Sequence, residues 1–346
     1  MDEIYVVSGG NGRINLYGAD YFPRISIGAG RGVDAPNGIY VAADGRLYIC
    51  QGPTAKNPPR LTVLNAAFFP LQEILLQKFP EADSFVPSRV SVGRNGAIYI
   101  AGINSRGVMV LDSEGNFSHW LKPQDKIWAE EEKDDYSKLP KESGDGADAP
   151  KENGEIAEED QQETELANLP DFLRPKKKTK LADEESKLFG PVQVTDVVCG
   201  AEGYVYLLSE ETSKVYVYNP AEELLFSFGK KGGSSGKMSR PRGLAVDEKK
   251  KCIYVVDYMR HTILVYNFAG RFLFEIGGKG SAPLWFNFPT ALALNRQGNM
   301  VVADLFNQRV QVLDVRFEAG FSLFGPSNKS DEENKEENKP TGEGKE

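Results

Sequence analysis

A short apolar pattern that is typical of a β-strand recurs along the chain at nearly constant intervals. The copies begin at Ile4, Leu47, Ile98, Val205, Ile253 and Met300. Successive copies are 43, 51, 107, 48 and 47 residues apart, and the longest interval falls to 40 once an acidic stretch of 67 residues is set aside. A repeat of this length, built of short strands, is typical of β-propeller blades, because each unit buries its faces only against its neighbours.

Each unit contains the signals of four antiparallel strands. A Pro-led strand such as residues 241–246 comes first, and a tight turn such as Asp44-Gly45 separates it from the recurring apolar strand. Asp-Gly and Asn-Gly pairs favour hairpin turns because they tolerate positive φ. A polar loop follows, then an alternating strand such as residues 215–218 and a closing strand such as residues 273–277. Six such units predict an all-β fold, a six-bladed β-propeller with four antiparallel strands per blade.

The first unit differs from the others because it begins directly with its second strand, at residues 4–7. The chain has six second strands and only five Pro-led first strands. We therefore expect either a first blade of three strands, or an inner strand supplied by residues removed upstream. An unpaired inner edge would be free to pair with another chain.

Acidic residues are concentrated in two stretches. The whole chain carries a net charge of −9, of which residues 123–189 hold −9 and residues 326–346 hold −3, so the repeats carry +3. Both stretches are too poor in aromatic and β-branched residues to offset their ordering entropy. We expect blades 1–3 in residues 1–122, a disordered acidic low-complexity insert between blades 3 and 4 in residues 123–189, blades 4–6 of the same domain in residues 190–325, and a disordered acidic tail in residues 326–346.

The last units contain the motifs of a known family. Residues 240–247 read Arg-Pro-Arg-Gly-Leu-Ala-Val-Asp, residues 253–257 read Ile-Tyr-Val-Val-Asp, and residues 301–312 repeat this second pattern. These motifs resemble the NHL repeat; the last two units match well, the fourth moderately and the first three loosely. The resemblance covers residues 1–122 and 190–325 and implies an NHL-like six-bladed β-propeller. It is specific for the fold and not for the function, since such propellers include binding modules and a few enzymes.

The loops between the second and third strands carry a basic residue in most units. These residues are Arg13, Arg106, Lys214, Arg260 and Arg309. One interpretation is a mildly basic rim that contacts a protein, peptide, glycan or RNA. The other is structural, with the arginines hydrogen-bonded to carboxylates such as Asp257 or Asp304. In the acidic insert, Trp128 and Phe172 are apolar side chains that dock either on the propeller or on a partner.

The sequence offers little for catalysis. The two histidines, His119 and His261, lie far apart in the repeat pattern and cannot form a multi-histidine metal centre. Aligned on Pro36, Pro87, Pro191, Pro241 and Pro289, the first positions of the inner strands carry no carboxylate that could bind calcium. Asp196 is the only acid deep in an inner strand. We therefore predict no catalytic residue, no metal site and no cofactor.

These features favour a non-catalytic scaffold that recognises a protein or peptide partner through the propeller loops and the acidic insert. The alternatives are a propeller enzyme, either a metal-dependent lyase or a lactone hydrolase, and single-stranded RNA binding on the rim. DNA is not expected as a partner, and RNA is disfavoured by the acidic total, although the acidity lies in the two stretches and not in the repeats. No apolar run is long enough to span a membrane. The start on a predicted strand favours a periplasmic or secreted protein, with its signal removed, over a cytoplasmic one. The oligomeric state and the partner's identity stay open.

Overall fold

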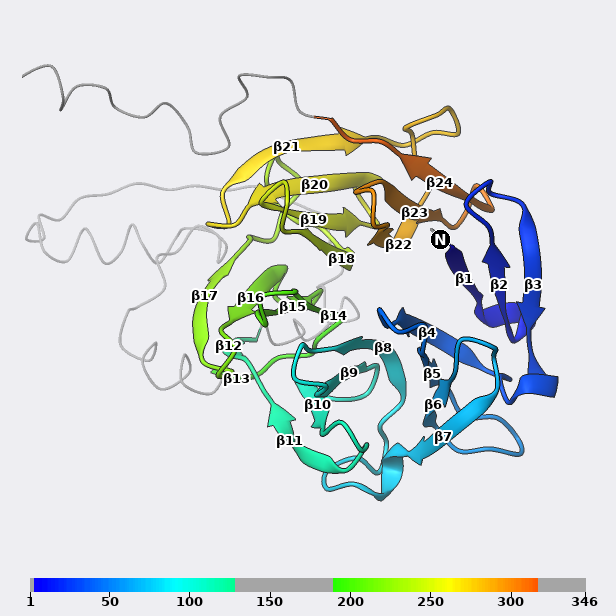
Figure 1. The fold of residues 1–346 in the computed structure, drawn as a ribbon. Helices are drawn as coiled ribbons and strands as arrows, with labels where there is room; N and C mark the ends of the chain where they lie inside the picture. Colours follow the sequence, from blue (N-terminus) through cyan, green and yellow to red (C-terminus); the bar gives the residue numbers. More distant parts are fainter. Residues whose placement is uncertain (1–2, 128–188, 317–346) are drawn as a thin grey trace, which may run out of the picture. The chain divides into compact units, whose positions relative to one another are not determined.

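The chain forms six antiparallel sheets that are arranged as blades around one axis (Figure 1). The computed structural model describes residues 3–127 and 189–316. Trp128, Phe172, most of the predicted acidic insert and the whole predicted tail lie outside these residues. The predicted all-β six-bladed propeller is confirmed, and the helices of the described residues are three single 3-10 turns: η1 (Gly9–Asn11), η2 (Ala29–Arg31) and η3 (Leu76–Lys78).

Blades 1 to 3 occupy the first part of the chain. Their strands are β1 (Ile4–Ser8), β2 (Arg13–Tyr17) and β3 (Pro23–Ile27) in blade 1, β4 (Pro36–Val41), β5 (Leu47–Gln51), β6 (Arg60–Leu64) and β7 (Pro70–Leu75) in blade 2, and β8 (Pro87–Val92), β9 (Ile98–Gly102), β10 (Val108–Leu111) and β11 (Phe117–Leu121) in blade 3. A separate two-stranded sheet pairs β12 (Gln124–Lys126) with β13 (Phe189–Pro191).

Blades 4 to 6 follow the same order from the inner strand outward. Their strands are β14 (Asp196–Cys199), β15 (Val205–Ser209), β16 (Lys214–Tyr218) and β17 (Leu224–Phe228) in blade 4, β18 (Pro241–Asp247), β19 (Cys252–Asp257), β20 (Thr262–Asn267) and β21 (Phe272–Gly277) in blade 5, and β22 (Pro289–Leu294), β23 (Met300–Asp304) and β24 (Arg309–Leu313) in blade 6. Blade 1 has three strands, as one of the two expectations had it. Blade 6 also has three within the described residues, where four were predicted.

The turn between the first and second strands is built on a glycine, as the sequence predicts. The φ angles of Gly45, Gly96, Gly203 and Gly298 lie between 84° and 90°. A side chain is strained at these angles, and glycine adopts them without a steric cost. The hairpins therefore form where the Asp-Gly and Asn-Gly pairs, and their Glu-Gly and Gln-Gly equivalents, place them.

The hydrophobic core lies between neighbouring blades. Ile253 and Val255 of β19 pack with residues of blade 4, whereas Tyr254 and Val256 of the same strand pack on the opposite side with residues of blade 6. Successive side chains of a strand point to opposite faces, so an alternating apolar strand fills two interfaces at once. Each fully buried aliphatic side chain contributes about 1.5–3 kcal/mol.

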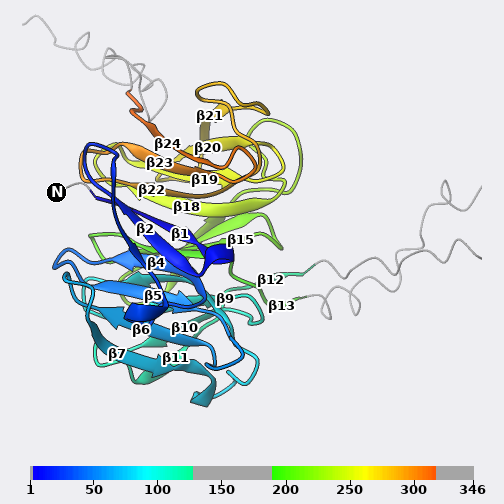
Figure 2. The ribbon, with the colours of Figure 1, turned by 90° about the vertical axis from the view of Figure 1, so that its right-hand side faces the viewer.

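Strand alternation places two kinds of connection at the same end of the ring. Because strands run antiparallel within a blade, the connections between blades lie at the same end as the loops between second and third strands. We call this end the loop face. The hairpin turns between first and second strands and between third and fourth strands lie at the opposite end, which we call the turn face; Figure 2 shows the blades from the side.

The inner strand of blade 4 departs from the predicted alignment. The other four Pro-led strands begin at their proline, but β14 begins at Asp196, five residues after Pro191. The intervening residues bond elsewhere: the amide of Val192 donates to Pro123 O at 3.0 Å, and Gln193 forms an isolated bridge with Arg106 of blade 3. Asp196 is consequently the first residue of its strand and not a residue deep within it.

Candidate binding site on the loop face

The last residue of the second strand holds the loop face together in three blades. In blade 5 the carboxylate of Asp257 accepts the amides of Ser239 at 2.6 Å and Arg240 at 3.0 Å. In blade 6 Asp304 accepts the amide of Asn287 at 2.7 Å. Each of these bonds ties the connection between two blades to the loop beside it. Hydrogen bonds to a charged acceptor are stronger than neutral ones, so these loops are well braced.

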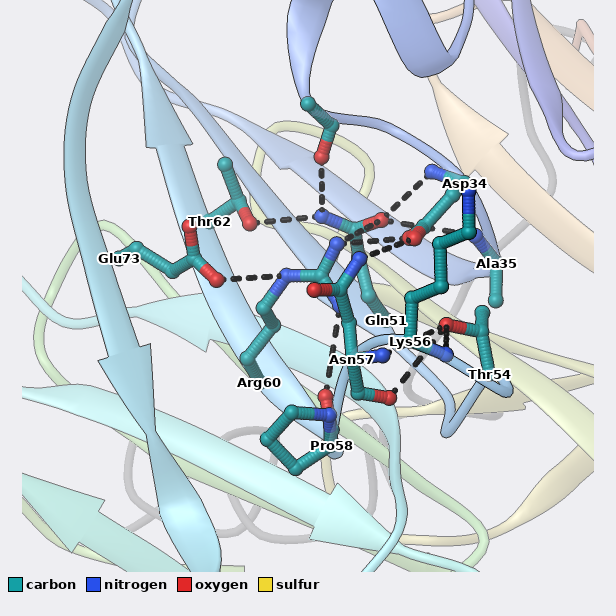
Figure 3. A network of polar contacts seen from close by, with 11 residues as sticks. Asp34, Ala35, Gln51, Thr54, Lys56, Asn57, Pro58, Arg60, Thr62 and Glu73 are labelled. Atoms are coloured by element: carbon teal, nitrogen blue, oxygen red, sulfur yellow. Dashed lines mark hydrogen bonds and ion pairs between the residues drawn. The ribbon is translucent and has the colours of Figure 1, made fainter.

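In blade 2 a glutamine at the same position joins the connection between blades to the loop beside it. The Oε1 atom of Gln51 accepts the amide of Asp34 at 2.9 Å, and its Nε2 atom donates to Gly32 O at 2.8 Å and to Thr62 Oγ1 at 2.6 Å. The polar network of Figure 3 surrounds this side chain. An amide side chain provides both a donor and an acceptor, so it can replace the aspartate of the later blades at this position.

Arg60 is the buried centre of the same network (Figure 3). Its guanidinium forms ion pairs with Asp34 at 2.7 Å and Glu73 at 2.9 Å, although its side chain is only 3% exposed. Burial alone would raise the pKa of Asp34, but the hydrogen bonds from Asn57 and Arg60 and the charge of Arg60 lower it below its usual value. The long loop of blade 2 is therefore fixed by a charged network under its surface.

Two of the predicted rim arginines form hydrogen bonds and ion pairs within the propeller. Arg309 donates to Asp304 at 2.9 Å and to the backbone oxygens of Ser281, Ala282 and Trp285 at 2.7–3.0 Å. This contact matches the structural interpretation of the repeat. Arg260 instead pairs with Glu275 at 2.6 Å and donates to the backbone oxygen of Ser234 at 3.2 Å.

Two further predicted rim residues pair with nearby carboxylates. Arg106 contacts Glu211 at 3.0 Å and donates to Pro191 O at 2.9 Å, beside a pocket of about 210 Å³. Lys214 contacts Asp125 at 2.7 Å. Arg13 differs, because it is exposed and no hydrogen bond or ion pair joins its side chain to another described residue.

A chain of aromatic rings on blades 5 and 6 was missed by the sequence analysis. The ring centroid of Phe288 lies 4.7 Å from that of Tyr258 and 4.8 Å from that of Phe306. Tyr258 and Phe306 belong to the second-to-third loops of blades 5 and 6, and Phe288 ends the connection between these blades. Contacts at these separations stabilise an aromatic cluster beyond its buried area.

The outer part of this cluster is open to solvent. Phe306 is 58% exposed, Leu305 is 53% exposed and Met259 is 50% exposed. We call Tyr258, Met259, Phe288, Leu305 and Phe306 the aromatic patch. The signal in the sequence was the apolar pairs Tyr258-Met259 and Leu305-Phe306, directly after a strand, where a polar loop is the rule.

Charged side chains border the aromatic patch. The guanidinium groups of Arg240 and Arg242 lie 5.8 Å and 5.7 Å from the ring centroid of Tyr258, and both arginines pair with Glu210. Such an apolar centre with a polar rim is the usual composition of a protein-binding surface.

His261 fixes the position of Phe288. Its Nδ1 atom accepts the amide of Phe288 at 3.0 Å, and the two rings are 4.4 Å apart. Burial, together with the charge of Lys279, lowers the pKa of His261, against the opposing charges of Asp257 and Asp304. The imidazole is therefore mainly neutral at pH 7, the form that can accept this hydrogen bond.

Polar contacts join neighbouring inner strands of the ring. Asp196 Oδ2 accepts the amide of Leu244 at 2.8 Å, which ties blade 4 to blade 5, and Arg89 donates to Asn37 O at 3.1 Å, which ties blade 3 to blade 2. Burial raises the pKa of Asp196, although the charge of Arg89 opposes this effect. Residues 3–127 and 189–316 contain no group of three or more histidine, cysteine or acidic residues that could hold a metal ion.

Comparison with known proteins supports the fold. No family model matches the chain, and no curated protein matches it significantly. Hydrazine synthase of Kuenenia stuttgartiensis is similar in structure, with a TM-score of 0.52 and 11% identity over 91% of this chain and 80% of that one. An auxiliary nutrient binding protein from Bacteroides ovatus also has a TM-score of 0.52, with 11% identity over 89% of this chain and 65% of that one.

Virginiamycin B lyase from Staphylococcus aureus is a more distant match, with a TM-score of 0.48 and 10% identity over 91% of this chain and 82% of that one. Identities this low show the fold alone. The protein is thus a six-bladed β-propeller, a class whose architecture supports binding and scaffold roles. The helices of the described residues are all too short to cross a membrane.

Proposed function

We propose that this protein is a non-catalytic, NHL-type scaffold that recognises a protein or peptide partner on its loop face, at the aromatic patch. The observation that carries the proposal is Phe306, which is 58% exposed at the end of a row of rings that contact one another at tilted angles. Large aromatic side chains of this kind dominate the affinity of many interfaces.

The bracing of the loops supports this proposal. Asn307 donates to Gly280 O at 2.9 Å, and the amide of Phe306 donates to Asn287 O at 3.0 Å. A loop that is held in one conformation before binding loses less entropy when the partner arrives.

The predicted basic residues have two different roles in the proposed function, bracing the loops and contacting the partner. Arg106, Lys214, Arg260 and Arg309 hold the loops in place, because each is paired within the propeller. Arg13 is the one of the five with a side chain available for direct contact. Trp128 and Phe172 stay proposed partner contacts from the acidic insert, outside the described residues.

The test compares two phenylalanines of similar exposure. Partners captured from the source cells would be identified by mass spectrometry, purified and titrated against the protein by calorimetry. Phe306→Ala is expected to raise the dissociation constant about tenfold or more, the usual effect of removing a hot-spot aromatic. Phe22→Ala is the matched control, since Phe22 is 67% exposed but lies on the turn face. Equal losses in both variants, or none in Phe306→Ala, would contradict the proposal.

Single-stranded RNA is the second candidate, on the strength of the two arginines beside Tyr258. Aromatic rings with neighbouring arginines can stack on bases. Retention on an RNA oligonucleotide that weakens steeply with salt would favour RNA, whereas a partner titration insensitive to salt would favour protein.

A further inference from the structure

A serine, a histidine and a glutamate are hydrogen-bonded in series where blades 3 and 4 meet on the turn face. Ser118 Oγ lies 3.0 Å from Nδ1 of His119, and Nε2 of the same ring lies 2.5 Å from Oε2 of Glu222. The serine and the histidine belong to β11, the closing strand of blade 3, and the glutamate lies in the turn between β16 and β17 of blade 4. A hydroxyl, a base and a group that orients the base, in contact in this order, are the parts of an activated nucleophile.

The carboxylate of Glu222 decides which nitrogen of His119 carries the hydrogen. A carboxylate accepts hydrogen bonds and donates none, so Nε2 is the donor in this contact. In the neutral imidazole Nδ1 is then an acceptor, and the hydroxyl of Ser118 donates to it. The basic nitrogen therefore faces the hydroxyl whose proton it would take.

Tyr99 fixes the glutamate. Its hydroxyl donates to Oε1 of Glu222 at 2.6 Å, and the residue is only 3% exposed. Burial, together with the hydrogen bond to Glu222 and its charge, raises the pKa of Tyr99, so the phenol stays protonated and remains a donor. The carboxylate is thus held beside the imidazole, where its charge stabilises the positive charge that His119 gains with a proton.

The pairing of β11 with β10 is irregular at the serine. Val110 lies opposite His119 and Leu111 lies opposite Phe117, so Ser118 has no partner in the register. A shift of this kind bends a strand and changes the direction of its side chains.

The serine–histidine pair is not part of the repeat. The same register shift occurs in the four other blades whose closing strand is described. The residues at the two equivalent positions are Arg24-Ile25 in blade 1, Leu71-Gln72 in blade 2, Leu225-Phe226 in blade 4 and Leu273-Phe274 in blade 5. A blade therefore forms without a hydroxyl and an imidazole here, and their presence in blade 3 is not explained by the fold.

Solvent reaches the two groups that would react. Ser118 is exposed, and the side chain of His119 is 44% exposed, whereas that of Glu222 is 21% exposed. The hydroxyl is accessible to a molecule in solution, while the carboxylate that orients the base is largely covered.

We propose that Ser118 is an acyl acceptor, whose hydroxyl is acylated by small activated esters with His119 as the base. Glu222 and Tyr99 are positioning residues for that base. The Oγ atom attacks the carbonyl carbon, so that a bond from Oγ to this carbon forms and the bond from the carbon to the leaving oxygen breaks. The proton of the hydroxyl moves to Nδ1 of the histidine and from there to the leaving oxygen. The products are an ester on the serine and a free alcohol or phenol.

This acylation is one covalent modification of the propeller and not a turnover reaction. It takes place on the turn face, so it depends neither on the aromatic patch nor on a partner at the loop face.

The test exposes the full chain to p-nitrophenyl acetate and follows acetylation of each serine by peptide mass spectrometry. Ser113 is the matched control inside the same molecule, because it is exposed in the turn of the same hairpin and its hydroxyl donates to Glu114 at 2.8 Å instead of to a histidine. We expect Ser118 to be acetylated about tenfold faster than Ser113 or more, since a positioned base accelerates such a step.

A variant without the imidazole separates a base from a merely structural contact. His119→Ala is expected to lower the acetylation rate of Ser118 about tenfold or more and to leave that of Ser113 unchanged. Free imidazole added to this variant is expected to restore part of the rate at Ser118, which a loss of structure would not allow. Thermal denaturation of the variant checks that it is folded.

Either of two results would overturn the proposal. One is equal acetylation of Ser118 and Ser113 in the native protein, a comparison that needs no variant. The other is a folded His119→Ala protein in which Ser118 reacts as fast as before, which would leave the histidine as a contact between blades 3 and 4 and nothing more.

Discussion

Residues 4–7 and residues 253–256 have the same sequence, Ile-Tyr-Val-Val, but opposite environments. In β19 all four side chains are completely buried, whereas in β1 all four are partly exposed. β19 pairs with strands on both edges and packs against blades on both faces. Within the described part of the chain, β1 pairs on one edge, and its Tyr5 and Val7 pack at the margin of the cluster shared with blade 2. Identical residues thus contribute differently to stability, depending on the strands and blades that pack around them.

The largest expected effect is a difference between two identical substitutions in these strands. Ile253→Ala is expected to lower the free energy of unfolding by about 2–5 kcal/mol, because it leaves a cavity between blades 4 and 5. Ile4→Ala is expected to cost less than about 1 kcal/mol, since its side chain already contacts solvent. Urea denaturation of both variants measures this difference, and equal costs would contradict the account.

A second comparison uses the residue that ends each of these strands. Asp257 is fully buried and accepts three backbone amides, so Asp257→Ala is expected to cost about 2–3 kcal/mol. Ser8 holds the same position in blade 1, and among the described residues its hydroxyl accepts a hydrogen bond only from the exposed Asn11 side chain. Ser8→Ala is expected to change stability by less than about 0.5 kcal/mol. A loss in Ser8→Ala as large as that in Asp257→Ala would show that position, and not bonding, sets the cost.

The smallest expected effect depends on pH and concerns the blade 5 and blade 6 loops. The pKa of His261 is lower in the folded protein than in the unfolded chain, so the unfolded chain takes up the proton first as pH falls. Stability is therefore fully present above pH 6.5 and declines as the pH drops through the lowered value.

The control for this effect is His261→Gln, which keeps an acceptor for the Phe288 amide but does not titrate. Thermal denaturation would be measured between about pH 7.5 and about pH 5, a range that brackets the titration of histidine. The loss of stability across this range is expected to be smaller in this variant than in the native protein. If the substitution left the pH dependence of stability unchanged, the titration of His261 would not be its cause.

The fold could be predicted from the sequence because its signals are local. The spacing of the apolar strands and the glycines at the hairpin turns are short-range features, and they lead to the observed six blades. The start of β14 could not be predicted, because it depends on the bonds of Val192 and Gln193 to Pro123 and Arg106, which are distant in the sequence.

The candidate site was predicted less well, for a related reason. The sequence shows that Arg309 is basic, but its acceptors Ser281, Ala282 and Trp285 lie in a connection that folds back onto it. Likewise, an apolar pair such as Leu305-Phe306 reads as a possible core segment until the structure shows that both side chains are exposed. The exposure of a side chain and its bonding partners depend on how the blades close into a ring, and the sequence of one repeat does not contain this information.

The most direct test of the central claim is photo-crosslinking at the loop face. The protein would carry p-benzoylphenylalanine in place of Phe306 and, in a second preparation, in place of Phe22. The account predicts a crosslink to the bound partner from position 306 on the loop face and none from position 22 on the turn face. Crosslinks from position 22 alone, or equally from both positions, would contradict it.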